Sequence, residues 1–387
     1  MKEISKFINK IHLGNCIDVL TQIPDNSIDS IYLDPPFFTQ KTHSLVDSKS
    51  KTEYSFNDKY KSLEEYLELI KSSLSECKRV LKGKGTIFLH CDKTASHHLR
   101  TILDEVFGVN NFLNEIVWSY KRWSNSRKGL LNSHQTILLY KKSKDWKFNT
   151  IYTDYSETTN VDQILQERER NLFGKSVYKK DEQGNVVKAN EKKGVPLSDV
   201  WEIPFLNPKA KERTGYPTQK PVELLKRIIE ISTDENDIIL DPFCGSGTTC
   251  VAAKLLKRNF IGIDISNDAV SLTKLRLNEM VITESQLLKK GKQSYVGKSD
   301  EELNLLNSIN ALPVHRNSLI DGYMKETLIP IIIQKKTDTV YSIKEKIVEL
   351  CKKQSPDTII IIQTTPSFQI DTTRCKLHII KTLACQL

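Results

Sequence analysis

The sequence predicts an α/β fold with a doubly wound, mostly parallel sheet and one antiparallel edge strand. Short apolar runs alternate with stretches of helical periodicity on both sides of a polar central segment. Two of these runs end in Asp34-Pro-Pro-Phe and Asp241-Pro-Phe-Cys-Gly-Ser-Gly, motifs typical of the carboxyl ends of parallel strands. Two other runs, 114–120 and 135–140, follow each other across a basic segment, which predicts the antiparallel edge.

Composition sets the broad class of the protein. The chain has 387 residues, of which 39% are apolar and 27% charged, so it is too long for a small adaptor and unlike collagen or low-complexity sequence. A net charge of +9 favours polyanionic partners. The N-terminus has no apolar signal segment and no run is long enough to cross a membrane, so we expect a cytoplasmic protein with no membrane partner. Eight scattered cysteines without CxxC pairs predict reduced thiols and no metal site.

The elements of the first half follow from local signals. The apolar run from Ile28 is a strand that stops at Asp34, because two prolines cannot continue a ladder. Apolar residues then recur at helical spacing from 63 to 81, with a capping-box pair, Ser62 and Glu65, at the start and Gly83 at the end. The remaining elements of this half are a strand at 85–91, a helix to about 107, and strands at 114–120 and 135–140.

A polar segment interrupts this alternation, which resumes after it. Residues 141–208 are charged, with a hairpin around Gly184, and are interpreted as an inserted region. The second half then predicts a helix at 221–231, a strand at 237–240, a helix at 248–257, a strand at 259–263 and a helix from 268. Residues 288–387 carry two apolar runs, 328–333 and 357–363, on either side of a helical stretch, and predict a small α/β appendage.

The glycine loop after the strand at 237–240 is a candidate cofactor loop. Gly245 and Gly247 let the backbone turn tightly and approach a ligand. Asp264 closes the next strand, near the spacing at which an acid binds ribose hydroxyls. Because Cys250 replaces the third glycine of GxGxxG, a nucleoside without a pyrophosphate fits better than a dinucleotide. An ordinary glycine turn, and Asp264 as a cap before Ser266, are the alternatives.

Asp34-Pro35-Pro36-Phe37 is the second candidate site. The prolines fix the backbone, so the Asp34 carboxylate and the Pro35 carbonyl are preorganised acceptors. A planar amine can donate two hydrogen bonds to them while its ring stacks on Phe37. The alternative is a strand end finished by a Pro-Pro turn with a buried Phe37.

These residues resemble the exocyclic-amino DNA methyltransferases, which methylate adenine N6 or cytosine N4 with S-adenosylmethionine (AdoMet). LDPPF is similar to their (D/N/S)PP(Y/F/W) catalytic motif, and DPFCGSGTT to their cofactor loop. The catalytic motif precedes the cofactor loop, as in the β group, and the resemblance covers residues 10 to 285. It implies a Rossmann-like AdoMet-dependent methyltransferase fold, with 1–140 as the catalytic half of the core, 141–208 as target-recognition region, 209–287 as AdoMet-binding half and 288–387 as appendage.

The resemblance also implies the site residues and the cofactor. Asp34, Pro35, Pro36 and Phe37 would be catalytic. AdoMet would be bound by Asn15, Cys16, Asp34, Thr218, Gln219, Lys220, Asp241, Phe243, Gly245, Ser246, Gly247, Thr248 and Asp264. Thr218-Gln219-Lys220 is similar to the family's TQKP segment, which implies that it holds the methionine carboxylate. Asn15 stands where the family has an acid on the adenine, and Gln135 stands where its His-Glu pair has Glu.

Lys121, Arg122, Trp123, Arg127 and Lys128 interleave basic groups with an aromatic ring, and Lys141, Lys142, Lys144 and Lys147 follow. They are candidate DNA contacts, or else a solvated basic face. The expected reaction is direct in-line methyl transfer to N6 of an adenine flipped out of duplex DNA. Cytosine-N4 transfer, a non-catalytic DNA-binding subunit, and a small-molecule or RNA methyltransferase are the alternatives. A homodimer and a companion restriction endonuclease are candidate partners.

Overall fold

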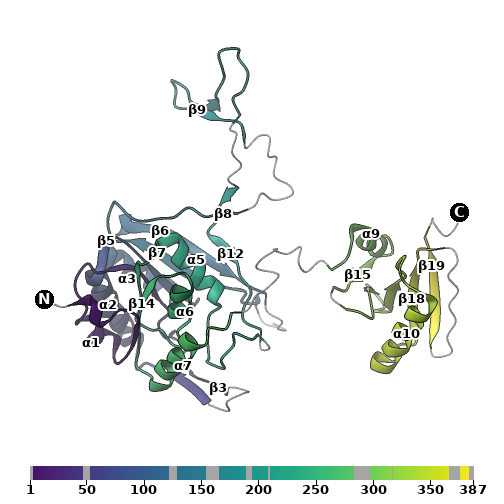
Figure 1. The fold of residues 1–387 in the computed structure, drawn as a ribbon, viewed down its shortest axis with the longest axis horizontal. Helices are drawn as coiled ribbons and strands as arrows, with labels where there is room; N and C mark the ends of the chain where they lie inside the picture. Colours follow the sequence, from purple (N-terminus) through teal and green to yellow (C-terminus); the bar gives the residue numbers. More distant parts are fainter. Residues whose placement is uncertain are drawn as a thin grey trace. The chain divides into compact units, whose positions relative to one another are not determined.

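A computed structural model describes residues 3–46, 53–121, 129–153, 165–188, 194–207, 210–282, 297–315, 317–365 and 375–382. The chain divides into two compact units, 1–283 and 284–387. Each unit has its own sheet and helices (Figure 1). Within the described residues, no helix is long and apolar enough to cross a bilayer.

The first unit is built on an eight-stranded sheet. Its strands, in spatial order, are β1 (Lys10–Leu13), β14 (Asn259–Asp264), β13 (Ile238–Asp241), β2 (Ile28–Leu33), β5 (Leu81–Cys91), β7 (His134–Lys141), β6 (Phe112–Ser119) and β12 (Val200–Glu202). All neighbouring strands are parallel except β7, which runs antiparallel to both β5 and β6. The mostly parallel sheet with one antiparallel strand is therefore confirmed.

Its place in the sheet differs from the prediction. β7 lies inside the sheet, because β6 and then β12 continue beyond it. β12 comes from the segment predicted as a wholly inserted region, and its Trp201 pairs with Trp118 of β6. The other edge strand, β1, was not predicted, since its four residues have only one buried side chain and little apolar pattern.

Helices cover both faces of this sheet. α1 (Cys16–Leu20), α2 (Leu63–Val80) and α3 (Ser96–Phe107) share one buried cluster with alternate strand residues such as Ile31 and Leu33. The residues between them, such as Tyr32, are buried outside that cluster. α5 (Val222–Ser232), which contacts β2 and β5, is followed by α6 (Thr248–Leu255) and α7 (Asn267–Asn278). The sheet is thus doubly wound, with apolar strands buried on both faces.

The start of α2 agrees with its sequence signal, and its end differs. Ser62 Oγ accepts from Glu65 N, as expected of an N-cap. The helix ends at Val80 rather than Gly83, because Leu81 already pairs with Ile28 and begins β5. Tertiary pairing has therefore overridden the glycine stop signal.

The remaining elements of the first unit are short. They are η1 (Ile4–Lys6), β3 (Thr42–Val46), β4 (Glu53–Asn57), η2 (Val109–Asn111), β8 (Tyr152–Thr153), β9 (Arg168–Arg170), β10 (Ser176–Tyr178) and β11 (Val195–Pro196). The predicted hairpin around Gly184 is present as an antiparallel bridge between Lys180 and Val186.

The second unit is a small α/β structure, as the sequence predicts. Its elements are α9 (Asp300–Ser308), β15 (Ala311–Pro313), β16 (Gly322–Met324), β17 (Pro330–Ile333), α10 (Val340–Gln354), β18 (Thr358–Gln363) and β19 (Lys376–Lys381). The five strands form one sheet in chain order, with the last three parallel. Two apolar clusters, one with α9 and one with α10, form its core.

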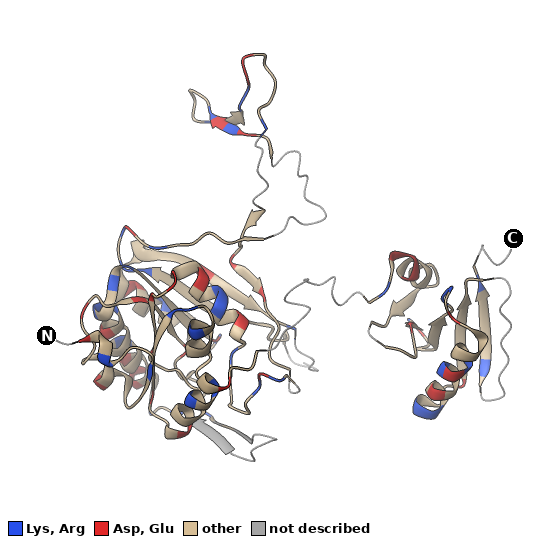
Figure 2. Ribbon diagram, viewed as in Figure 1, with Lys and Arg blue, Asp and Glu red and all other residues tan. Residues whose placement is uncertain are grey.

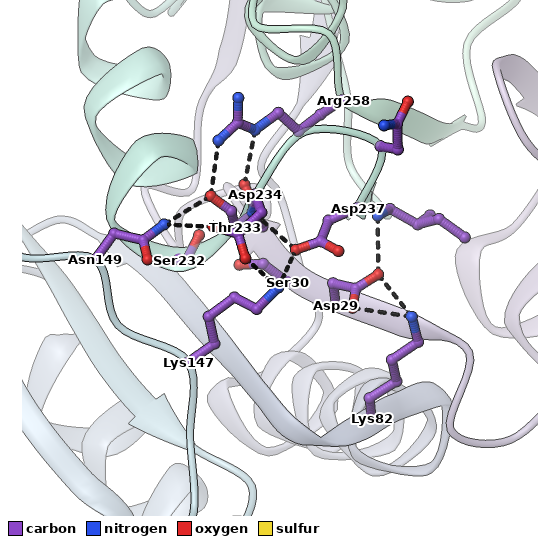
Figure 3. Close-up of polar contacts among 12 residues, drawn as sticks. Asp29, Ser30, Lys82, Lys147, Asn149, Ser232, Thr233, Asp234, Asp237 and Arg258 are labelled. Carbon is purple, nitrogen blue, oxygen red and sulfur yellow. Dashed lines mark hydrogen bonds and ion pairs between the residues drawn. The ribbon is translucent and has the colours of Figure 1, made fainter.

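A polar network joins the segment after β7 to the loop before β13 (Figure 3). Lys147 Nζ lies 2.8 Å from Asp234 Oδ2 and 2.6 Å from Asp237 Oδ2. Asp29 pairs with Lys82 and accepts from Ile238 N at 2.9 Å. These groups lie at the amino ends of β2 and β13, whereas Asp34 follows the carboxyl end of β2. Lys147, one of the predicted DNA contacts, is therefore held in an ion pair with two carboxylates.

We expect Lys147→Ala to lower the free energy of unfolding by about 1 kcal/mol, because it leaves two neighbouring carboxylates without their shared cation. DNA affinity should stay within about twofold of wild type, since the network lies away from the strand ends that carry the motifs. Urea unfolding and fluorescence anisotropy with duplex DNA would measure the two effects. A large loss of DNA affinity without a loss of stability would indicate that Lys147 contacts DNA.

Candidate active site

One cavity of about 450 Å³ lies where β2, β13 and β14 end. It brings together motifs that are two hundred residues apart in the sequence, as expected for the carboxyl edge of a parallel sheet. The predicted residues that line it are Asn15, Cys16, Asp34, Pro35, Pro36, Phe37, Thr218, Gln219, Lys220, Asp241, Phe243, Gly245, Ser246, Thr248 and Asp264. The two candidate sites of the sequence are therefore one site.

Asp34 is paired on one side only. Its Oδ2 forms an ion pair with Nζ of Lys220, which is itself buried. Its Oδ1 is buried and has no hydrogen-bond partner. Burial raises the pKa of Asp34, and the charge of Lys220 counteracts that rise. A carboxylate with one oxygen fixed and the other unpartnered can accept a hydrogen bond from a ligand.

Aromatic and cationic groups surround this carboxylate. Lys220 Nζ lies 5.5 Å from the centre of the Phe37 ring, and the His90 ring lies 6.2 Å from it. Pro35 is buried, and Phe37 is partly exposed in the cavity wall. The Asp-Pro-Pro-Phe segment is thus a cavity wall rather than a strand end with a buried phenylalanine.

The glycine loop and the end of β14 are joined by the Asp264 carboxylate. Asp264 Oδ2 accepts from Gly245 N and Oδ1 from Ser266 N, each at 2.8 Å. Ser266 itself caps α7 by accepting from Ala269 N. Asp264 therefore connects both loops, and its carboxylate lines the cavity, where it can also accept from a ligand hydroxyl.

Arg276 of α7 supports this loop, and the sequence reasoning missed it. Its Nη1 donates to Ser246 O at 2.6 Å and to Thr248 Oγ1 at 3.0 Å. Burial lowers the pKa of Arg276 to about 10. A single arginine on the buried side of a helix was the available signal, but nothing local indicates which loop it would reach.

Gly247 is a predicted binding residue that does not line the cavity. Its φ is +73°, and it is the N-cap position of α6. A Cβ at this position would lie 2.2 Å from Thr273 Cγ2 of α7. Gly247 therefore permits the close packing of α7 against the loop.

We expect Gly247→Ala to lower the free energy of unfolding by about 2–5 kcal/mol, from the left-handed backbone and the contact with Thr273. Gly83→Ala is the matched control, since a Cβ there meets no atom within 4 Å. Urea unfolding of both variants would measure the difference. Equal stability of the two would show that the loop relaxes without strain.

The segment 218–220 has three different roles. Thr218 adopts φ +61°, and Lys220 pairs with Asp34. Gln219 is buried, and its amide bonds within the loop, accepting from Thr214 N at 2.9 Å and donating to Glu212 O at 2.9 Å. Within this segment, the Lys220 cation is therefore the group that pairs with the Asp34 carboxylate.

Asn15 and Cys16 lie at the start of α1. Asn15 caps the helix, because its Oδ1 accepts from Ile17 N at 2.9 Å. Cys16 Sγ lies 3.5 Å from Ser73 Oγ, and burial raises the pKa of its thiol. Asn15 also lines the cavity, and its amide retains an NH₂ group and a second lone pair for a ligand.

Several cavity residues were not predicted. Tyr32, Asp58, Tyr60 and Tyr216 line the wall, and burial raises the pKa of Tyr60 to about 12. Tyr216 packs against Gly245, where a Cβ would lie 3.3 Å from Tyr216 Cε1. Tyr32 lies in β2, and the other three lie in loops; none of the four belongs to a recognisable motif.

The predicted DNA contacts are only partly described. Lys121 is exposed, and Arg122, Trp123, Arg127 and Lys128 lie outside the described residues. Lys142 Nζ binds Asn26 Oδ1 at 2.8 Å, and Lys141 Nζ lies over the Trp146 ring. In Figure 2, basic and acidic residues alternate on β9, whose sequence is Arg-Glu-Arg.

The fold and the cavity define an enzyme core that juxtaposes a glycine-loop ligand site with a carboxylate-proline-proline-aromatic wall. Comparison with known proteins agrees. The family model described as DNA methylase matches residues 28–275. The chain belongs to this family of DNA methyltransferases.

Two curated relatives, each more than 30% identical, support the same assignment. The chain is 31% identical over 280 residues to the Type II methyltransferase M2.MboI of Moraxella bovis, covering 70% of this chain and 88% of that protein. It is 33% identical over 265 residues to M.HpaI of Haemophilus parainfluenzae, covering 68% and 73%. Among solved structures, the M1.HpyAVI–SAM complex is 22% identical with a TM-score of 0.43, over 70% of this chain and 98% of that one.

Proposed function

We propose that this enzyme transfers a methyl group from AdoMet to the N6 amino group of an adenine flipped out of duplex DNA. The observation that carries the proposal is the Asp34 carboxylate, which has one oxygen on Lys220 and the other unpartnered, in the same cavity as the glycine loop. The Asp34 carboxylate and the Pro35 carbonyl, beside the Phe37 ring, suit the planar amine of a base that loses its hydrogen-bond partners when it leaves the duplex.

The cavity residues fit AdoMet. The Asp264 carboxylate suits ribose hydroxyls, the backbone at Gly245 allows close approach, and Phe243 offers an apolar wall. Asn15 retains polar groups for an adenine edge, and Thr218 lines the same cavity. When bound, AdoMet supplies a methyl group on a positively charged sulfur, ready for direct displacement.

Asp34 and Pro35 would activate the amine. The lone pair of an exocyclic amine is delocalised into the ring, so the nitrogen is a poor nucleophile. Accepting its two hydrogens on the Asp34 carboxylate and the Pro35 carbonyl favours a tetrahedral nitrogen and stabilises the positive charge that develops there. Phe37 would hold the flipped ring by stacking, and the proton would leave from the methylated nitrogen after transfer.

Cytosine N4 is the second candidate base, because its amine presents the same two hydrogens. The Asp of Asp34-Pro-Pro-Phe favours adenine, since Ser is commoner in the cytosine-N4 enzymes that the motif resembles. Duplex DNA is the proposed partner. A homodimer and a companion restriction endonuclease stay predictions from the resemblance, and sedimentation of the protein with DNA would test the first.

The test incubates the protein with unmethylated genomic DNA and methyl-labelled AdoMet, followed by digestion to nucleosides. Labelled N6-methyladenine is the expected product. Labelled N4-methylcytosine would mean that the target base is cytosine, with the same type of reaction. AdoMet binding without label in DNA would overturn the proposal and favour a DNA-binding subunit or another substrate.

A further inference from the structure

A buried string of polar side chains lies behind the catalytic carboxylate, across three strands of the sheet. Tyr32 of β2 places its hydroxyl 2.8 Å from His90 Nδ1, and His90 Nε2 lies 3.0 Å from Gln135 Oε1 of β7. The His90 side chain is fully buried, and the Trp118 ring meets it edge-on at 5.6 Å. The proposed reaction uses none of these three polar groups.

The partners fix where the hydrogens of this string lie. An amide oxygen only accepts, so the Nε2 that faces Gln135 Oε1 carries the ring hydrogen. In a neutral imidazole the other nitrogen, Nδ1, then has a lone pair and accepts from the Tyr32 hydroxyl. Burial and the charge of Lys220 lower the pKa of His90 well below its ordinary value, which agrees with a neutral ring.

The state of this ring decides how many acceptor sites Asp34 keeps. His90 Nδ1 lies 3.9 Å from Asp34 Oδ1, the oxygen that has no partner. Lys220 already occupies Oδ2. A protonated His90 would present an N–H toward Oδ1. Lys220 and His90 would then occupy both oxygens of the Asp34 carboxylate.

We propose that Gln135 and Tyr32 are positioning residues that hold His90 as the neutral Nε2–H tautomer, so that Asp34 Oδ1 remains free for the amino group of the target base. The inference rests on the proposed function and adds to it a control on the catalytic carboxylate.

The charged and titratable groups that face His90 are Asp34 and Tyr32, from β2 and the turn after it, and Lys220, before α5. A carboxylate in place of the Gln135 amide would add an acceptor with negative charge at Nε2. It would favour the imidazolium and raise the His90 pKa. The protonated ring would exist below that raised pKa and disappear above it.

The test compares pH profiles of single-turnover methyl transfer for wild type and Gln135→Glu. In wild type, His90 should add no acid limb between about pH 6 and pH 8, because its pKa lies well below the ordinary value. Gln135→Glu should be within a few-fold of wild type at the alkaline end and lose about tenfold toward pH 6. The AdoMet dissociation constant should not change with the substitution.

Two controls make the result specific to His90. The double variant His90→Asn with Gln135→Glu should lack the acid limb, because the titrating ring is gone. Gln22→Glu makes the same change at an exposed glutamine that does not line the cavity, and it should behave as wild type. Nitrogen-15 NMR of histidine-labelled protein should show a neutral Nε2–H ring in wild type at pH 6 and an imidazolium in Gln135→Glu.

A flat profile for Gln135→Glu, or an equal loss at every pH, would overturn the inference. So would an imidazolium at His90 in wild type at pH 6. The NMR signature does not depend on turnover. A wild type that binds AdoMet and methylates no DNA would therefore remove the proposed function, and the tautomer would still be tested.

Discussion

Asp34→Ala is expected to lower the rate of methyl transfer to DNA by about two to three orders of magnitude while AdoMet still binds. The substitution removes the preorganised acceptor for the amine, and groups that stabilise developing charge carry effects of this size. Label incorporated per minute at saturating DNA and AdoMet measures the loss. Isothermal titration calorimetry measures the AdoMet affinity of the variant.

Removal of Asp34 also leaves the buried Lys220 without its carboxylate, so a folding defect must be separated from a catalytic one. Asp145→Ala is the matched control, because Asp145 forms only an exposed ion pair with Lys84. Thermal unfolding of both variants completes the comparison. Turnover of Asp34→Ala at the rate of the control would exclude Asp34 from the reaction.

Lys220→Met should give the second largest effect, a fall of about ten- to a hundredfold at pH 7 that is recovered as the pH rises. Burial raises the pKa of Asp34, and Lys220 is the cation that opposes this rise. Without it the pKa rises further. Because the ionised carboxylate is the active form, activity is present above that pKa and lost as the pH falls through it.

A pH profile of the single-turnover rate measures this shift. Lys226→Met is the control, because Lys226 lies on α5, the helix that follows Lys220, and its partner Glu223 lies 3.6 Å away. AdoMet affinity separates two roles of Lys220. An unchanged AdoMet affinity would mean that Lys220 acts on Asp34. A large loss of AdoMet affinity with an unchanged pH profile would mean that Lys220 binds the methionine carboxylate instead. The second outcome would contradict the prediction.

The sequence predicted the parts of the site that depend on local pattern. Apolar runs predicted most of the central strands, and the prolines after Asp34 and the glycines after Asp241 marked strand ends. Each motif was predicted at the carboxyl end of a parallel strand, and parallel strands align these ends at one edge of a sheet. The cavity at that edge contains both motifs.

Other features depend on pairings that no local pattern contains. The place of β7 between β5 and β6, and the addition of β12, depend on which edges meet after long loops close. The end of α2 moved to Val80 because a distant strand pairs with Leu81.

The sequence by itself determined the chemistry available to this protein: an acceptor carboxylate on a rigid turn, a glycine loop and their order in the chain. Only the tertiary structure decided how the carboxylate is held, because Lys220 is 186 residues from Asp34 and His90 is 45 from Gln135. Ion pairs and buried hydrogen bonds of this kind require that distant side chains be desolvated together, and this happens only once the sheet has formed.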